Sequence, residues 1–155
     1  MSPVARLLAR LVVGVVLVVS LTAAAPPNDH ERYVLDRTNW DRGTEGVAPL
    51  ALKDMLTDRA RAWAADLARR GTLQHSDLRT IQPGWTEVGE NVGRSTSVED
   101  VMRRLEASPS HRRNLLAGKY TRIGIGTARA ADGNIYVVQV FWRGCGTNGQ
   151  AHCAR

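Results

Sequence analysis

The sequence lacks the compact motifs by which many enzymes and metal sites are recognised. It contains no H-E-x-x-H pair, no C-x-x-C pair and no serine framed by a G-x-S-x-G turn. These absences count against a zincin-type protease, a paired-cysteine zinc site and a serine hydrolase of the α/β-hydrolase type. No nucleic-acid-binding motif, internal repeat or low-complexity linker occurs either. Any functional site must therefore be assembled from residues that lie far apart in the sequence.

Cysteine is also scarce, and its position is informative. The two cysteines, Cys145 and Cys153, lie in a glycine-rich tail after the last predicted strand. In an exported protein a pair this close predicts a disulfide, and closing a loop of about nine residues contributes ~2.6 kcal/mol in the chain-entropy model. A metal pair is the competing interpretation, but even with His152 it would offer only three ligands. The disulfide is the favoured interpretation.

The N-terminal segment is typical of a secretory signal peptide. Arg6 and Arg10 precede an apolar run that begins at Leu11 and ends in the small residues Ala23-Ala24-Ala25. From Leu11 to Ala25 there are 15 residues, whereas a membrane-spanning helix needs roughly 20. Cleavage of this segment is therefore the main prediction, and an uncleaved membrane anchor is the alternative. Membrane contact is expected only in that second case, through the uncleaved segment. The predicted division is a signal peptide at 1–25, a domain at 26–144 and the tail at 145–155.

The predicted exported chain is basic and long enough for one domain with one core. Removing residues 1–25 takes two of the 21 basic residues and no acid, which leaves 19 against 15 and a net charge of +4. Arginines spread along predicted helices are typical of a solvated basic face. Export argues against a nucleic-acid partner, so an anionic wall polymer or an anionic envelope lipid is the partner that the charge fits best. The expected location is secreted or associated with the cell envelope.

Hydrophobic periodicity predicts an α+β fold. The strongest helical pattern runs from Leu52 to Arg70, with Gly71 as its left-handed cap. Asp132-Gly133 is typical of a hairpin turn. Because the helices cannot bury their apolar faces alone, they must pack on a sheet. The expected helices are 31–42, 52–70, 97–107 and a short one starting at Pro109 and capped by Ser108, and the expected strands are 85–92, 121–130 and 135–142.

Three residues could carry chemistry. His75 lies in a polar loop, Glu90 lies between Gly89 and Asn91, and His111 lies in the first turn of the helix that Ser108 caps. The helix N-terminus and the neighbouring arginines favour the neutral imidazole of His111, which is the form that binds metals or acts as a base. Each residue also has a simpler interpretation, namely a surface histidine, a solvent-facing carboxylate and a second capping side chain. Spacing alone does not bring them together.

A larger pattern joins these residues. Four segments occur in a fixed order, and two shorter ones precede them: an N-x-x-R pair at Asn39 and Arg42 and an A-x-x-W-A segment at Ala60–Ala64. This order resembles the bacterial branch of the CAP superfamily (cysteine-rich secretory proteins, antigen 5 and pathogenesis-related 1), also called the SCP-like extracellular domain. The resemblance covers about Leu35 to Trp142 and implies a three-layer α-β-α sandwich around a small antiparallel sheet. The four segments are Gln74-His75-Ser76, Gly89-Glu90-Asn91-Val92, Ser108-Pro109-Ser110-His111-Arg112-Arg113-Asn114-Leu115-Leu116, and Ile123-Gly124-Ile125-Gly126 leading to Val138-Gln139-Val140-Phe141.

The resemblance also implies a central cleft lined by two histidines and two glutamates that binds divalent cations in some members. His75, Glu90 and His111 match three of these four positions, and the supporting residues in the matched segments are Asn91, Ser108, Asn114 and Gln139. The fourth acid does not transfer, because Leu105 stands where the family has a tryptophan and Ser108 where it has the glutamate. Glu106 and Glu87 are the nearest replacements. Two imidazoles and one carboxylate suit Zn²⁺ and leave an open coordination position.

Three functions remain open. The favoured one is a secreted, non-catalytic binding module for a lipid, a wall component or another protein, with a divalent metal in the cleft. A metal-dependent hydrolase or peptidase that uses His75, Glu90 and His111 is the second, but if Glu90 binds the metal no second carboxylate is evident as a base. The third is a scaffold in which the His/Glu cluster only organises the fold.

Overall fold

The computed structural model describes residues 25–81 and 87–143. The predicted signal segment up to residue 24 and both cysteines lie outside this part of the chain. No helix in the described part is long and apolar enough to cross a membrane. The helices are α1 (Asp29–Thr44), α2 (Asp54–Arg70), the 3-10 turn η1 (Leu78–Thr80), α3 (Val98–Ala107) and α4 (Pro109–Leu115), and the strands are β1 (Ala51–Leu52), β2 (Val88–Ser95), β3 (Arg122–Arg129) and β4 (Ile135–Trp142).

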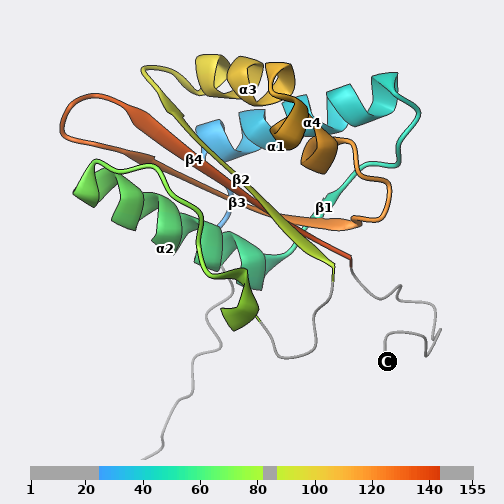
Figure 1. Ribbon diagram of the computed structural model, residues 1–155, viewed down its shortest axis with the longest axis horizontal. Coiled ribbons are helices and arrows are strands. Elements are labelled where there is room, and N and C mark those ends of the chain that lie inside the picture. Colours follow the sequence, from blue (N-terminus) through green and yellow to red (C-terminus); the bar gives the residue numbers. More distant parts are fainter. Residues whose placement is uncertain (1–24, 82–86, 144–155) are drawn as a thin grey trace, which may run out of the picture.

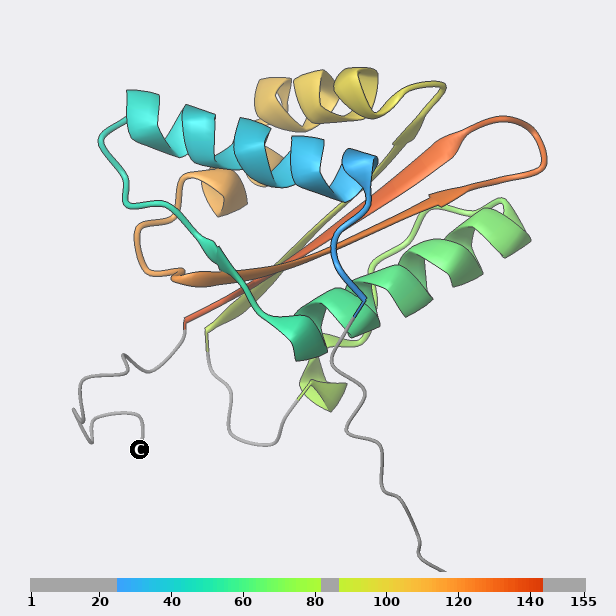
Figure 2. The ribbon, with the colours of Figure 1, turned by 180° about the vertical axis from the view of Figure 1, so that it is seen from behind.

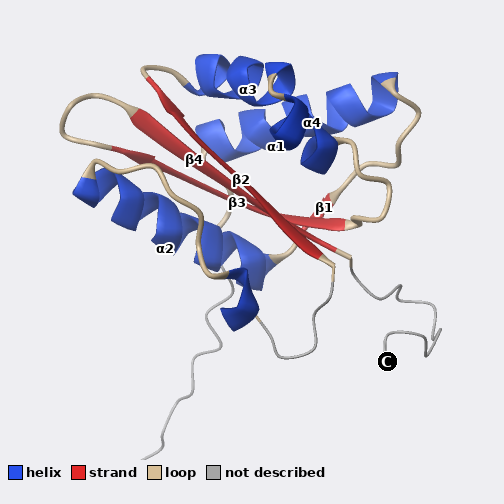
Figure 3. Ribbon diagram, in the orientation of Figure 1, coloured by secondary structure: helices blue, strands red, loops and turns tan. Residues whose placement is uncertain are grey.

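These elements form the three layers that the family resemblance implied. Helices α1, α3 and α4 cover one face of the sheet, and α2 covers the other (Figure 1). The view from behind shows α1 beside α3 on the same face (Figure 2), and the colouring by secondary structure separates the helical layers from the sheet (Figure 3). The hydrophobic core is accordingly split into two clusters, one between the sheet and α3 and one between the sheet and α2.

The sheet is mixed rather than purely antiparallel. Its strand order is β1-β3-β4-β2, with β2–β4 and β3–β4 antiparallel and the two-residue β1 parallel to β3. The sequence pattern placed Leu52 inside a helix, but the side-chain amide of Asn39 bonds both the N–H and the C=O of Leu50 and holds the following residues extended. Helix α2 therefore begins at Asp54. Strand β2 runs to Ser95, beyond the predicted limit, because it pairs with all eight residues of β4.

Helix α2 lies unusually close to the sheet. Its buried residues recur at three- and four-residue spacing, and Gly71 ends it with φ 66°. Beneath it, the isoleucines of Ile123-Gly124-Ile125-Gly126 point into the opposite core and the glycines face the helix. A Cβ at Gly124 or Gly126 would lie 2.1 Å from a backbone carbonyl carbon of α2. The two glycines are thus required by the close approach of helix and strand.

Helix α1 holds the chain around α4 through a buried arginine. Arg42 is 0% exposed, and its guanidinium donates to the carbonyl oxygens of Ala48 (2.7 Å), Leu115 (2.8 Å), Ala117 (3.1 Å) and Tyr120 (3.2 Å). Two of these carbonyls lie at or just beyond the C-terminal end of α4, where helix carbonyls lack intrahelical partners. Arg42 therefore fixes the position of the helix that carries His111.

A salt bridge links α1 to α3. Arg37 donates through Nε and Nη2 to the two carboxylate oxygens of Glu106 at 2.7 and 2.8 Å. Beside this pair lies Asp41, whose side chain is only 7% exposed and has one oxygen without a hydrogen-bond partner in the described part of the chain. Burial, together with the neighbouring Glu106, raises the pKa of Asp41 to about 6, although Arg37 and Arg112 act in the opposite direction.

This raised pKa predicts that stability falls as the pH rises. An unfolded aspartate titrates near 3.9, so the folded chain binds a proton more tightly at Asp41. The resulting stabilisation is fully present below about pH 4 and is lost as the pH rises through about 6, a change of about 2 to 3 kcal/mol in the free energy of unfolding. We expect Asp41→Asn to remove this contribution from urea-unfolding curves measured between pH 4 and 8.

Asp36→Asn is the matched control, because Asp36 lies on the same helix and is exposed. Its pH dependence should follow that of the unsubstituted protein. If Asp41→Asn also leaves the pH dependence unchanged, the proton is not held at the junction of α1 and α3.

Candidate functional site

Glu90 on β2 holds the loop that carries His75. Its carboxylate is buried, and Oε1 accepts from the Ser76 backbone N–H at 2.9 Å and from His75 Nδ1 at 2.8 Å. Oε2 accepts from the Ser76 hydroxyl at 2.6 Å. Both oxygens are therefore occupied, and Glu90 fixes the orientation of the imidazole. The His75 ring is 61% exposed, and its Nε2 has no hydrogen-bond partner among the described residues.

His111 is held from the start of α4. Helix α4 begins at Pro109 after Ser108, as predicted, but the Ser108 hydroxyl accepts no backbone hydrogen bond of the helix. It lies 2.8 Å from His111 Nδ1 and 3.2 Å from the Ser110 hydroxyl instead. The expectation of a side-chain cap was therefore wrong, because the imidazole competes successfully for the same oxygen. Like His75, His111 is held through Nδ1.

The electrostatic setting keeps His111 neutral. Burial is the main cause that lowers its pKa from the usual value, and the charge of a protonated His75 adds to the effect. The neutral imidazole was predicted, but for a different reason. The prediction invoked the helix dipole and the nearby arginines, whereas burial is the main cause in the structure. The interaction also places the two imidazoles within electrostatic reach of each other. At neutral pH the uncharged His111 ring keeps one nitrogen unprotonated, and because Nδ1 contacts Ser108, Nε2 is the nitrogen left for a ligand.

A chain of side-chain amides, of which Asn91 and Gln139 are fully buried, connects Glu90 and His111. Asn91 Nδ2 donates to the His111 carbonyl oxygen at 3.1 Å and to Gln139 Oε1 at 3.2 Å. Asn114 Nδ2 donates to Asn91 Oδ1 at 3.0 Å and to the Glu90 carbonyl oxygen at 3.2 Å. Of the four supporting residues that the sequence singled out, Asn91, Asn114 and Gln139 therefore form one network that joins β2, β4 and α4, whereas Ser108 contacts His111.

Two further members of this arrangement, Thr38 and Ser76, had no role assigned to them from the sequence. Gln139 Nε2 donates to the buried Thr38 hydroxyl at 2.9 Å, which extends the amide chain to α1. Ser76 supplies two of the three hydrogen bonds that Glu90 accepts. Ser76 stands next to His75 in a matched segment, and Thr38 stands next to the matched Asn39. Proximity in sequence to these residues was the only feature that could have pointed to a role for Ser76 and Thr38 in the site.

The acids considered as replacements for the missing glutamate lie elsewhere. Glu106 is bound by Arg37, and the Glu87 carboxylate lies 2.7 Å from Lys119 Nζ. Within residues 25–81 and 87–143, no group of three or more histidine, cysteine or acidic side chains is placed to hold a metal ion. Glu90 as a metal ligand stays a prediction, and in the arrangement described its oxygens already have partners.

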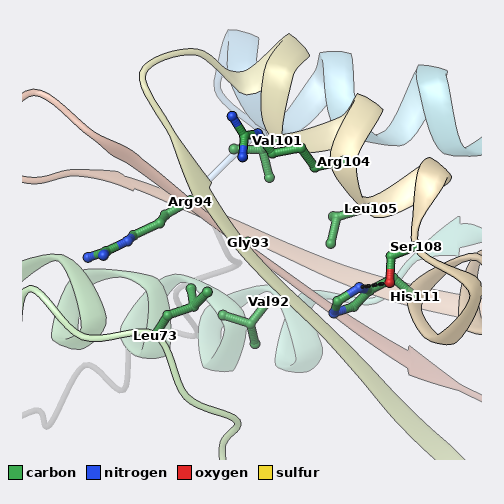
Figure 4. Close-up of a pocket in the computed structure, with 9 residues that line it drawn as sticks. All are labelled: Leu73, Val92, Gly93, Arg94, Val101, Arg104, Leu105, Ser108 and His111. Atoms are coloured by element: carbon green, nitrogen blue, oxygen red, sulfur yellow. Dashed lines mark hydrogen bonds between the residues drawn. The ribbon is translucent and has the colours of Figure 1, made fainter.

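A pocket of about 220 Å³ adjoins His111. Its walls are largely apolar, with Arg94 and Arg104 near one end and Ser108 and His111 at the other (Figure 4). The close-up shows the hydrogen bond between Ser108 and His111 on the α4 side of the edge strand β2. The apolar residues of the wall are Leu73, Val92, Val101 and Leu105.

Comparison with known proteins agrees with this architecture. The profile of the cysteine-rich secretory protein family (CAP) matches residues 35–141. YkwD of Bacillus subtilis, an uncharacterized protein, is 26% identical over 130 residues, which cover 76% of this chain and 50% of YkwD. The chain thus spans about half the length of that curated relative.

Solved structures share the fold. An outer surface protein of Borrelia burgdorferi superposes with a TM-score of 0.68 at 16% identity, covering 77% of this chain and 96% of that one. An extracellular protein of Bacillus anthracis with an SCP domain gives 0.64 at 21% identity, covering 78% of this chain and 45% of that one. NaASP2, solved with Zn²⁺, gives 0.58 at 14% identity, covering 74% and 80%. At these identities the likeness establishes the fold alone.

Proposed function

Because the chain belongs to the cysteine-rich secretory protein (CAP) family, we propose that it is an exported, non-catalytic binding domain. Its cleft would engage an extracellular ligand at His75 and His111, with a divalent cation held by the two imidazoles. The observation that carries this proposal is that both rings are fixed through Nδ1 while each Nε2 lacks a partner in the described part of the chain. Export is supported by the predicted signal segment and by the outer-surface and extracellular relatives.

The donor set suits a zinc-like ion. Imidazole nitrogen is a preferred ligand of Zn²⁺, and a histidine ligand typically donates its other ring N–H to a carboxylate. Glu90 makes that contact with His75, and the lowered pKa of His111 keeps its ring neutral. His75 and His111 would hold the ion, which would act as a Lewis acid toward a bound ligand. Water or the ligand would complete the coordination.

Binding is favoured over hydrolysis because the nearby carboxylates already have hydrogen-bond or ion-pair partners. A hydrolytic site needs a base within hydrogen-bond reach of the attacking water. Glu90 already accepts three hydrogen bonds, and Glu106 and Glu87 are paired with Arg37 and Lys119. The described arrangement therefore supports recognition of a ligand, which fits an anionic envelope lipid, a wall component or a protein as partner.

Calorimetric titration with Zn²⁺ tests the cleft. We expect the exported protein to bind one equivalent, and His75→Ala and His111→Ala each to abolish that binding because each removes one of the two nitrogen ligands. His30→Ala is the matched control, since His30 lies on α1. Its binding should be unchanged. Zinc binding that persists in the double variant His75→Ala/His111→Ala would refute the metal site. If the unsubstituted protein binds no zinc and the two variants are only less stable, the result would favour the scaffold function, in which the His/Glu cluster only organises the fold.

The role of Glu90 gives a separate prediction. In Glu90→Gln the side chain keeps its shape, but its NH₂ group faces donors from Ser76 and His75 and the negative charge behind the imidazole is lost. We expect Zn²⁺ affinity to fall about 10- to 100-fold while the site persists. Glu87→Gln removes an acid that pairs with Lys119 and should leave the affinity unchanged. Equal affinity in both variants would show that Glu90 does not position His75.

A further inference from the structure

Strand β2 has an open edge beside the pocket. It is the terminal strand of the sheet and pairs with β4 on one side only. The Glu87 carbonyl oxygen accepts from the Arg143 N–H at 3.1 Å, and hydrogen bonding alternates along an antiparallel ladder. The backbone groups of Glu90, Val92 and Arg94 therefore point away from β4. The bond from Asn114 Nδ2 to the Glu90 carbonyl oxygen agrees with this direction.

Beyond Glu90 this edge is unpaired. On the side away from β4, the N–H and C=O groups of Val92 and Arg94 form no hydrogen bond with any residue that the structure describes. Figure 1 shows β2 with α3 and α4 above it and α2 below it, so the edge lies between the two helical layers. Unpaired edges are templates for pairing with another chain, and proteins commonly protect them.

The pocket surrounds the same stretch of strand. Val92 and Gly93 lie at its centre and Arg94 at one end, with Leu73 on the α2 side and Leu105 on the α3 side (Figure 4). A Cβ at position 93 would come 2.7 Å from Val101 Cγ1, so the glycine lets the edge lie close against α3. Because side chains alternate between the faces of a strand, a strand added here would direct every second side chain toward the apolar wall.

From this geometry we propose that the edge of β2 at Val92–Arg94 binds an extended peptide by strand addition, with one apolar side chain of the peptide in the pocket. The inference rests on the proposed binding function and names the class of ligand. At about 220 Å³ the pocket is smaller than the ~300–1,000 Å³ of sites for drug-sized ligands, which fits a single side chain. Strand addition supplies affinity through the main chain and specificity through such side-chain pockets.

Charge specifies the peptide further. The Arg104 side chain is 68% exposed, and its bond to Asp100 uses Nε at 2.7 Å, which leaves its terminal nitrogens free of any other described hydrogen bond. An acidic residue next to the apolar one would meet this guanidinium. A hydrocarbon chain in the same groove would cover the N–H and C=O groups of the edge without satisfying them, which is costly. The ligand that fits is therefore an extended peptide with an apolar and an acidic residue close together.

The test uses two substitutions at one exposed position. Arg94→Pro removes the outward N–H without removing a bond to β4, and Arg94→Ala loses the same side-chain contacts with Gly71 and Tyr136 but keeps the N–H. Displayed random hexapeptides are selected on the exported protein, and the enriched peptides are synthesised. We expect peptides that combine an apolar and an acidic residue, bind the unsubstituted protein and Arg94→Ala alike, and bind Arg94→Pro about tenfold more weakly. Thermal unfolding confirms that both variants are folded.

A second measurement does not depend on any variant. On the unsubstituted protein, N-methylation of the paired peptide amide should abolish binding, and hydrogen exchange should show new protection at the Val92 and Arg94 amides. Failure to enrich any peptide, equal binding to Arg94→Pro, or binding of decanoate in the pocket without peptide binding would overturn the proposal. Zinc titration of Arg94→Pro separates the two ideas, because intact zinc binding there leaves the proposed function standing while strand addition fails.

Discussion

Replacing Arg42 with methionine is expected to lower the free energy of unfolding by about 4 kcal/mol, a large part of the 5–15 kcal/mol typical of a domain. Methionine fills much of the same space but donates no hydrogen bond. The carbonyl groups of Ala48, Leu115, Ala117 and Tyr120 would lose the donor that they share, and each buried group left unpaired costs roughly 1–3 kcal/mol unless water replaces the donor. Urea unfolding monitored by circular dichroism measures the effect.

Arg113→Met is the matched control for this prediction. It makes the same substitution and the same change of charge at an exposed position of α4. Its effect should stay within about 0.5 kcal/mol, as for most surface substitutions. A similar small loss in both variants would mean that the buried guanidinium does not stabilise the end of α4.

Adding one methyl group at Gly126 is expected to destabilise the protein by about 3 kcal/mol or more, at the upper end of what overpacking costs. The Cβ of Gly126→Ala would lie 2.1 Å from the Ala60 carbonyl carbon and 2.2 Å from the Arg61 backbone nitrogen. Both are backbone atoms of α2, so no side chain can turn aside. The helix must shift away from β3, which loosens the packing of Leu56, Ala60 and Ala64 on the sheet.

The control is the same change at a glycine with free space. Gly43→Ala lies in α1, where a Cβ would meet nothing within 4 Å. Alanine favours the helix over glycine by about 0.8–1.0 kcal/mol, so this variant should be slightly more stable. If Gly126→Ala proves as stable as the unsubstituted protein, helix and sheet are not in the close contact described.

Elements with a strong pattern could be predicted from the sequence almost to the residue. Strand β4 spans the predicted 135–142, and α2 ends before Gly71 as expected. Strand β1 could not be predicted, because two residues carry no periodicity and their conformation depends on Asn39, 11 positions before Leu50. Local patterns thus define the long elements, whereas tertiary hydrogen bonds define the short one.

For the candidate site, the sequence proposes a set of residues but not the contacts among them. The order of matched segments identified His75, Glu90 and His111 without indicating that Glu90 would be occupied by Ser76 and His75. Ser108 was recognised as preceding α4, but only the folded packing decides whether its hydroxyl bonds the backbone or the imidazole. The open edge of β2 depends on which strand ends the sheet, and the sequence does not specify that order.

The central claim is that His75 and His111 are two halves of one cation site, each held by Nδ1 and each binding through Nε2. Long-range ¹H–¹⁵N correlation spectra of the imidazoles, recorded during titration with Zn²⁺, test it most directly. We expect the Nε2 resonances of both histidines to shift together and to saturate at one equivalent, while Nδ1 of His75 remains protonated beside Glu90. A shift of only one histidine, or coordination through Nδ1, would contradict the account.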